Sequence, residues 1–283
     1  MPIQPAIERP RQWNAKQALR SLLPQAALNW REASYFKKFG EVEMHLVEIL
    51  CRNDQDAIDV GTNYGGYIHF MRRHARRVLG FEPIPEFVEL LRRKFPRDVT
   101  IEPIALSDGA GEAELYMPLI GDVMVSGCST ISAAASAAYP AHRRLRVRTA
   151  RLDDVYAGTV GFIKIDVEGH QQAVLDGAAG TIARCRPRLL VEIDQKLAPG
   201  GLERAKAYFD RLGYSGHYVH RGRLGRLEDF SVARLQDPAN KPDLTSTLHE
   251  RPRDDDYVDN FIFLPPGEPG DTEDNMRKRL ASI

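Results

Sequence analysis

Glycine and acidic residues with the spacing of a ligand-binding turn occur early in the chain. The segment DVGTNYGG places Asp59 just before Gly61, and Asn63 and Gly65 follow at alternate positions. Glycine in such a turn lets the backbone approach a ligand closely and begin a helix tightly. Glu82 ends the next apolar run, where a carboxylate can accept hydrogen bonds from both hydroxyls of a ribose. Together these residues indicate a nucleoside site.

The composition of the turn distinguishes between nucleoside ligands. The dinucleotide fingerprint G-x-G-x-x-G needs glycine where this chain has Asn63, and the phosphate loop G-x-x-x-x-G-K-[ST] does not occur. Asp59 would repel a pyrophosphate lying against the turn. The same carboxylate could bind the ammonium group of a nucleoside that carries an amino acid, directly or through water. S-adenosylmethionine is such a molecule, so the pattern favours it over NAD.

A second group of ionisable residues lies in KIDVEGH. Lys164, Asp166 and Glu168 occupy alternate positions, so their side chains project together while the strand continues. Burying three charges on one strand face is costly without partners. One interpretation is an ion pair of Lys164 with Asp166 that shapes the loop. The other is a cofactor-binding or catalytic role, in which Asp166, Glu168 or His170 removes a proton from a substrate. His170 is equally consistent with the start of a helix.

These residues follow apolar runs that alternate with amphipathic helices. A strand, a helix and a strand in close succession normally form a right-handed parallel crossover. We therefore predict an α/β fold, with a mostly parallel seven-stranded sheet, helices on both faces and a final antiparallel strand. In such a sheet ligands bind at the carboxyl ends of the strands, where the polar residues lie. The apolar runs cover residues 57–60, 78–81, 99–107, 161–169, 188–193 and 257–266.

The parts of the chain differ in composition. We expect an N-terminal arm over residues 1–40, a folded domain over 41–266 and a flexible, charged tail over 267–283. Residues 109–160 are predicted to form an insertion over the active site. In it, EAELYMP and RLRVRTARL alternate as in an antiparallel hairpin, and VSGCSTISAAASAAYP suits a loop or short helix over a pocket.

Charge and cysteine usage exclude several classes of protein. The 39 Lys and Arg residues balance 39 Asp and Glu residues, which argues against nucleic acid or an anionic membrane as a partner. The first residues lack an apolar run suited to secretion or to spanning a bilayer, so we expect a cytoplasmic protein. Cys51, Cys128 and Cys185 form no C-x-x-C pair, and the histidines show no metal-binding spacing, so we predict no disulfide and no bound metal.

Several segments of the chain resemble a known family. AIDVGTNYGGYI, GFEPIPEFVELL, ALSDGAGEAELY, LDDV, FIKIDVEGHQQAVLDGA and RPRLLVEI are similar, in order and spacing, to the FkbM-type S-adenosylmethionine-dependent methyltransferases. The resemblance covers Glu41 to Ile193. It implies a Rossmann-like methyltransferase domain that transfers a methyl group, typically to a hydroxyl oxygen. The family often has an acid after EGH, where this chain has Gln171, so any role of that acid is not carried over.

The predicted site combines the glycine turn, the ribose acid and the turn after the third strand. We expect the glycine turn to hold the methionine end of the cofactor, Glu82 the ribose and the 105–108 turn the adenine edge. The predicted acceptor is a hydroxyl on a small molecule, sugar or glycan. A nucleic-acid methyltransferase and a non-catalytic nucleotide-binding protein on the same fold remain as alternatives. The predicted cofactor-binding residues are Asp59, Gly61, Asn63, Gly65, Glu82, Pro83, Ala105, Ser107, Asp108 and Asp166, and the predicted catalytic residues are Lys164, Asp166, Glu168 and His170.

Overall fold

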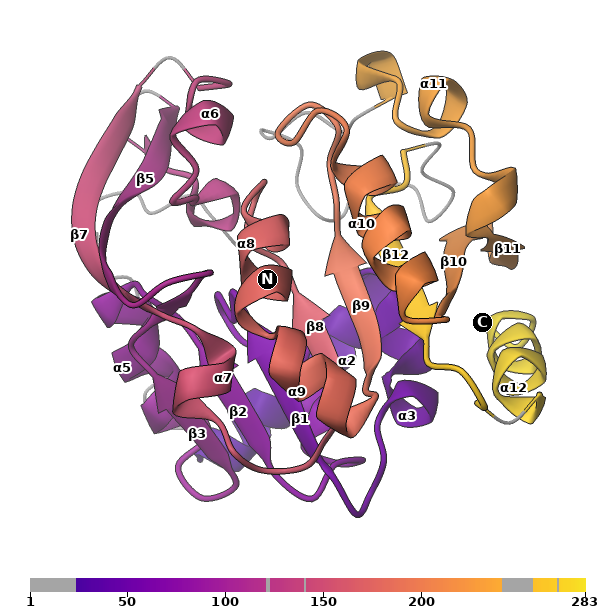
Figure 1. The fold of residues 1–283 in the computed structure, drawn as a ribbon. Coiled ribbons are helices and arrows are strands. Elements are labelled where there is room, and N and C mark those ends of the chain that lie inside the picture. The colour runs from indigo at the N-terminus through magenta and orange to yellow at the C-terminus, as the bar shows by residue number, and fades with distance from the viewer. Residues whose placement is uncertain (1–23, 121–122, 140, 241–256, 269) are drawn as a thin grey trace.

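A central sheet with helices on both faces organises the molecule (Figure 1). The computed structural model describes residues 24–120, 123–139, 141–240, 257–268 and 270–283. The sheet has eight strands in the order β11-β10-β12-β9-β8-β1-β2-β3. Its strands are β1 (Asp56–Val60), β2 (Val78–Phe81), β3 (Val99–Glu102), β8 (Val160–Ile165), β9 (Arg188–Glu192), β10 (Ser215–His220), β11 (Arg223–Arg226) and β12 (Asn260–Leu264).

The direction of the strands confirms the predicted α/β class. β3, β2, β1, β8 and β9 are parallel, whereas β12 pairs antiparallel with both β9 and β10. The predicted count of seven strands is wrong, because the antiparallel pair β10 and β11 lies outside the six predicted apolar runs and brings the total to eight. The sequence did not predict β11, since RLGR is short and carries a single apolar side chain that becomes buried, Leu224.

Burial explains why the central strands are continuous apolar runs. Every residue of β1 and β8 is buried, as expected when helices cover both faces of a parallel sheet. One apolar cluster packs α3, α4, α5 and α12 against the sheet, and a second packs α7, α8, α9 and α10 against the opposite face. These helices are α3 (Val47–Leu50), α4 (Ile68–Met71), α5 (Pro85–Lys94), α7 (Leu152–Val155), α8 (Gln171–Gly177), α9 (Ala179–Cys185), α10 (Gly201–Arg211) and α12 (Asp271–Leu280).

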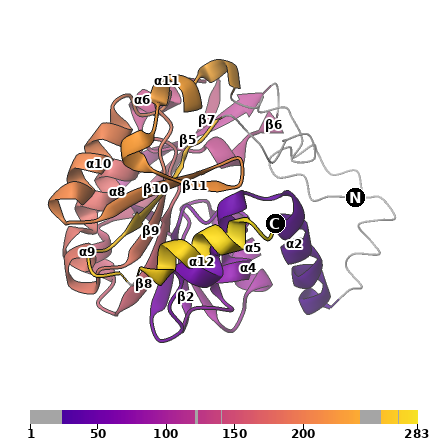
Figure 2. The ribbon, with the colours of Figure 1, turned by 90° about the vertical axis from the view of Figure 1, so that its right-hand side faces the viewer.

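Both ends of the described chain are helical. Where the sequence predicted a flexible tail, α12 lies across the sheet face that also carries α2 (Gln25–Phe39), as Figure 2 shows. Met276 and Leu280 of α12 are four residues apart, share one helix face and are buried in the core. Two apolar residues among charged neighbours give a weak sequence signal, which is why this helix was missed. The predicted arm over residues 1–40 contains α2, and its first 23 residues lie outside the described chain.

A second, smaller sheet rises beside the carboxyl ends of the central strands (Figure 1). The predicted antiparallel hairpin is confirmed, because β5 (Gly111–Ile120) pairs with β7 (His142–Ala150) over eight residues. β7 also pairs with β4 (Ala105–Leu106), which follows β3 in the chain and so connects the hairpin to the central sheet. The connecting segment contains the short helix α6 (Ala133–Ser136).

None of the described helices is both long enough and apolar enough to cross a membrane.

Candidate active site

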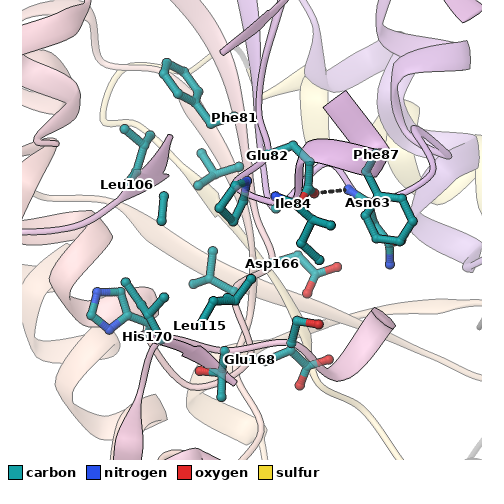
Figure 3. A pocket seen from close by; sticks show the side chains of 18 of the residues that line it. Asn63, Phe81, Glu82, Ile84, Phe87, Leu106, Leu115, Asp166, Glu168 and His170 are labelled. Carbon is teal, nitrogen blue, oxygen red and sulfur yellow. Dashed lines mark hydrogen bonds between the residues drawn. The ribbon is translucent and has the colours of Figure 1, made fainter. Parts of the chain in front are cut away.

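A cavity opens at the carboxyl ends of β1, β2 and β8 (Figure 3). About 600 Å³ of empty space lies within it, part of it open to solvent. The second sheet and its connecting segment contribute to the wall through Leu115, Ser129, Thr130 and Ile131. Of the predicted site residues, those that line the cavity are Gly61, Asn63, Glu82, Pro83, Ala105, Asp166, Glu168 and His170.

Glu82 is a buried acidic side chain of the cavity that two backbone amides hold. It is 3% exposed, and its carboxylate accepts hydrogen bonds from the backbone amides of Asn63 (2.8 Å) and Ile84 (2.9 Å). Figure 3 shows it facing the cavity. Burial raises the pKa of Glu82 to about 7, against the lowering effect of the two amides. Because each carboxylate oxygen has a second lone pair, both oxygens can still accept from ligand hydroxyls.

Apolar side chains form the walls on either side of Glu82. Phe81 and Leu106 come from β2 and β4, Ile84 and Phe87 from the start of α5, and Leu115 from β5 (Figure 3). Such walls suit the flat face of a base, while the acid at the floor suits a sugar. This region therefore has the shape and polarity expected of a nucleoside site.

Close packing explains the glycines of the turn. A Cβ on Gly61 would lie 1.7 Å from the carbonyl oxygen of Asp166, so the ends of β1 and β8 touch there. Gly65 has a φ of +79° and would place a Cβ 2.8 Å from Leu91 and 2.9 Å from Phe95. Gly65 thus lies outside the cavity lining of the described chain, and its position reflects packing on α5.

Asp59 also lies away from the cavity lining of the described residues. It is 3% exposed and pairs in register with Lys164 across β1 and β8. Burial raises the pKa of Asp59 to about 7, with Lys164 opposing this rise and Asp166 and Glu41 adding to it. Asp59 therefore contributes to a buried charged layer beneath the cavity.

Lys164 and Asp166 form the ion pair that the sequence suggested as one interpretation. Lys164 is 1% exposed, and its Nζ lies 3.1 Å from Asp166 Oδ2 and 4.9 Å from the ring centroid of Tyr67. Asp166 lines the cavity as well, so the pair does not preclude contact with a ligand. Lys164 holds the Asp166 carboxylate from behind.

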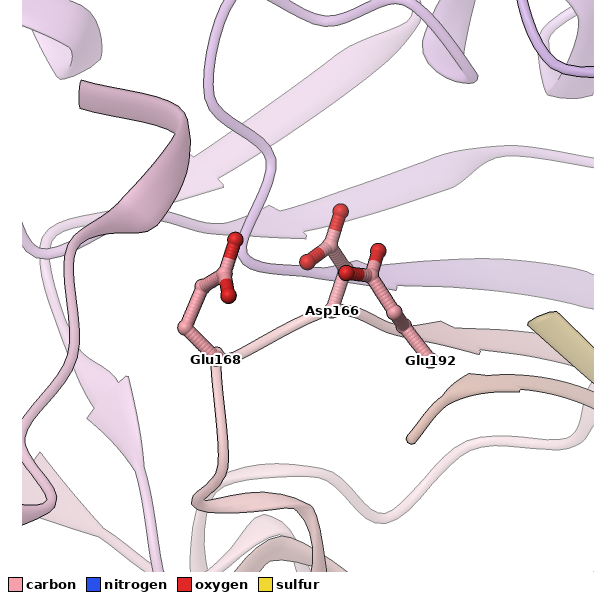
Figure 4. Close-up of side chains that lie close together, drawn as sticks. All are labelled: Asp166, Glu168 and Glu192. Atoms are coloured by element: carbon pink, nitrogen blue, oxygen red, sulfur yellow. The ribbon is translucent and has the colours of Figure 1, made fainter. Parts of the chain in front are cut away.

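Three carboxylates converge beside the cavity (Figure 4). Asp166, Glu168 and Glu192 each offer an oxygen within 4.8 Å of the others, a geometry that could share one cation. Burial raises the pKa of Glu192 well above its usual range, and Asp166, Asp259 and Glu168 raise it further. Sequence reasoning missed Glu192. Its signal was an acid at the end of the 188–193 run, at the same sheet edge as Asp166.

His170 connects the cavity to the turn after β4. Its Nε2 lies 2.9 Å from Ser107 Oγ, and Ser107 Oγ donates to Asp108 Oδ1 at 3.1 Å. Since the hydroxyl proton goes to Asp108, His170 Nε2 donates to Ser107, which leaves the lone pair on Nδ1. Burial lowers the pKa of His170, with Asp108 opposing this, so the ring is neutral at pH 7. Ser107 and Asp108 lie behind the described cavity lining and hold the imidazole.

Comparison with known proteins agrees with this geometry. The family model described as the methyltransferase FkbM domain matches residues 59–215, more than half of the chain, and the chain therefore belongs to this family. No curated protein sequence matches the chain.

The solved structures that are similar to this chain are distant from it in sequence. Methyltransferase FkbM from Methylobacillus flagellatus KT is 15% identical, with 75% of this chain and 44% of that chain covered and a TM-score of 0.46. This chain thus spans less than half the length of that protein. An rRNA methylase from Streptococcus thermophilus is 7% identical, with coverages of 79% and 93% and a TM-score of 0.41. A Streptococcus mutans protein solved in complex with SAH is 9% identical, with coverages of 79% and 96% and a TM-score of 0.38.

Proposed function

We propose that this protein is an S-adenosylmethionine-dependent methyltransferase that methylates a hydroxyl oxygen on a small molecule, sugar or glycan. The observation that carries the proposal is Glu82, a buried acid held by two backbone amides at the floor of an apolar-walled cavity. Membership of the FkbM methyltransferase family supports the reaction type. The zero net charge supports an acceptor other than nucleic acid and argues against a partner held by bulk electrostatics, such as an anionic membrane.

The residues of the cavity fit this cofactor. Glu82 would accept from the ribose hydroxyls, and the apolar walls with Ala105 would contact the adenine. Asn63 Oδ1 is buried with no hydrogen-bond partner among the described residues, and it faces the same space. Asp166 supplies a carboxylate that can accept from the ammonium group. The donor set therefore matches a nucleoside that bears an amino acid.

The chain's own residues would then align the acceptor and remove its proton. When bound, the cofactor supplies a methyl group activated by the sulfonium. His170 Nδ1 would take the proton of the acceptor hydroxyl, since the neutral ring keeps a lone pair there. Asp166 and Glu168 would orient the acceptor, and Lys164 would hold Asp166 in place.

Thermal unfolding and calorimetry with S-adenosylhomocysteine test the proposal. At a hundredfold excess over Kd, bound ligand adds about 2.7 kcal/mol, or about 4–5 °C in Tm for a chain of this size. NAD is the matched control and should leave Tm unchanged. Stabilisation by NAD alone would refute the cofactor assignment. A panel of hydroxyl and amine acceptors, with a labelled methyl donor, then tests the acceptor class.

A further inference from the structure

Helix α2 touches the glycine turn although it lies outside the segment matched by the family model, residues 59–215. No α2 residue is among the described residues that line the cavity. Its contacts instead reach the turn from behind. A Cβ on Gly66 would lie 3.2 Å from Phe36 of α2, so the turn backbone rests directly on that ring.

A buried charged group fastens α2 to this place. Glu32 of α2 is 5% exposed, and its carboxylate lies 2.8 Å from Lys94 Nζ and 3.1 Å from His69 Nε2. Burial alone would raise the pKa of Glu32, but the hydrogen bond from His69 and the charge of Lys94 lower it overall. Asn29, one turn earlier on α2, donates to the carbonyl of Lys94 at 2.7 Å. The helix is thus anchored through Lys94 at the end of α5.

The same lysine also holds the turn. Lys94 Nζ donates to the carbonyl oxygen of Tyr64 at 2.6 Å. Tyr64 lies between Asn63, whose amide donates to Glu82, and Gly65, which packs on α5. Its ring packs against Phe87, which lines the cavity, with centroids 4.7 Å apart. One ammonium group therefore joins the N-terminal helix to the backbone that would hold the cofactor.

We propose that Glu32 and Lys94 are positioning residues for the cofactor, and that α2 acts as a strap that keeps the glycine turn in its binding conformation. If α2 leaves, the Lys94 ammonium loses the carboxylate of Glu32 as its ion-pair partner. The turn then loses a backbone contact and the Phe36 ring at once. The identity of the cofactor rests on the proposed function. The contact of α2 with the glycine turn does not depend on which ligand the turn holds.

A charge-neutral pair of substitutions tests the strap without leaving a buried charge unpaired. Glu32→Gln combined with Lys94→Met removes the ion pair and the bond to Tyr64. Trp30→Ala is the matched control, since Trp30 is on α2 and 70% exposed. The readouts are the Kd for S-adenosylhomocysteine at 25 °C and hydrogen exchange of the amides of residues 61–66 in the unliganded protein.

We expect the double variant to bind S-adenosylhomocysteine about tenfold more weakly, which corresponds to one lost hydrogen bond. Exchange of the 61–66 amides should become faster, and the control should match the wild type in both measurements. A lower Tm with unchanged Kd and unchanged exchange would overturn the proposal and leave α2 as a stabilising element only. If the double variant does not fold, the same two measurements are made on Phe36→Ala, which removes the ring under Gly66 and should also weaken binding and speed exchange. A wild type that binds no S-adenosylhomocysteine would refute the proposed function, whereas the exchange measurement would still decide on the strap.

Discussion

The two sides of the cavity hold their acids in different ways. At the end of β2, the Glu82 carboxylate accepts from two backbone amides, and apolar side chains surround it. At the ends of β8 and β9, Asp166, Glu168 and Glu192 face one another, and the buried Lys164 pairs with Asp166. Main-chain donors fix the first acid, whereas the second group is governed by mutual repulsion.

This difference separates binding from chemistry. An acid fixed by amides is organised before a ligand arrives and loses little entropy on binding, so we expect it to determine cofactor affinity. Carboxylates that repel one another gain from taking up a proton or from an approaching cation. The β8 and β9 side is therefore where we expect proton transfer and pH dependence.

The largest effect is expected at His170. His170→Ala removes the proposed proton acceptor and should lower kcat by roughly 10²–10⁴-fold, while the Kd for S-adenosylhomocysteine changes much less. Steady-state kinetics give kcat and calorimetry gives the Kd. Ser107→Ala keeps the imidazole but removes its hydrogen-bond partner, so its kcat should lie between those of His170→Ala and the wild type. Near-normal kcat in His170→Ala would remove it as the base and leave Asp166 or Glu168, or alignment alone, as the source of catalysis.

The next largest effect is expected at Glu82. Glu82→Ala removes charge-assisted hydrogen bonds to the ribose and should raise the Kd about thirtyfold to a thousandfold at pH 8, where the acid is ionised. Calorimetry on the folded variant gives this number. Glu102→Ala, at the end of the neighbouring strand β3, serves as a control that should bind normally. An unchanged Kd in folded Glu82→Ala would show that this acid does not contact the cofactor.

The buried acids behind Lys164 should make stability depend on pH. Burial raises the pKa of Glu43 to about 8, and Glu41 adds to this. The folded state then holds a proton that the unfolded state loses above pH 4.5, so the free energy of unfolding falls as pH rises from 4.5 through 8. Glu43→Gln should therefore stabilise the protein more at pH 8 than at pH 5.5, by on the order of 3 kcal/mol.

Urea unfolding of the wild type and Glu43→Gln at both pH values measures that difference. Histidines whose pKa is lowered, such as His69 and His170, make the free energy of unfolding rise with pH, opposite to the effect of Glu43. Both proteins contain these histidines, so their contribution cancels in the difference between the two proteins. A gap between the two proteins that stays constant, or shrinks, as pH rises would contradict the expected charge state of Glu43.

The smallest effect is expected at Glu192. Burial and its acidic neighbours raise the pKa of Glu192 well above its usual range, which favours the neutral acid, so an amide is a close substitute for this side chain. Glu192→Gln should then change the Kd for S-adenosylhomocysteine by less than about twofold, which is within 0.4 kcal/mol or so. A much larger change by calorimetry would mean that Glu192 is ionised and meets the ligand, and the two sides of the cavity would be more alike than we infer.

The sequence predicted the cavity lining well because a parallel sheet determines where strand ends lie. Glu82 and Asp166 follow buried runs, and their meeting at one edge needs no knowledge of side-chain contacts. The position of Asp59 could not be predicted in the same way, because every residue of β1 is buried and the sequence does not tell which face of the sheet each side chain occupies. Gly65 stays a predicted cofactor-binding residue, and its positive φ also fits its close packing against Leu91 and Phe95.

Other features were out of reach because they depend on distant partners. Glu43 and Glu192 meet around Lys164 only after β9 and the segment before α3 have packed. Similarly, α12 is held by Met276 and Leu280 against residues more than two hundred positions away, such as Val47. A local pattern carries no record of such contacts.

The position of β12 between β9 and β10 has a consequence for synthesis on the ribosome. β9 and β10 are both translated before β12, yet β12, the strand that joins them, ends at Leu264. At ~5–20 residues per second, the nascent chain would wait a few seconds with two open strand edges and without Phe261 and Phe263 in the core. A chain stalled in that interval would present unpaired edges to other chains, so chaperone demand should peak there.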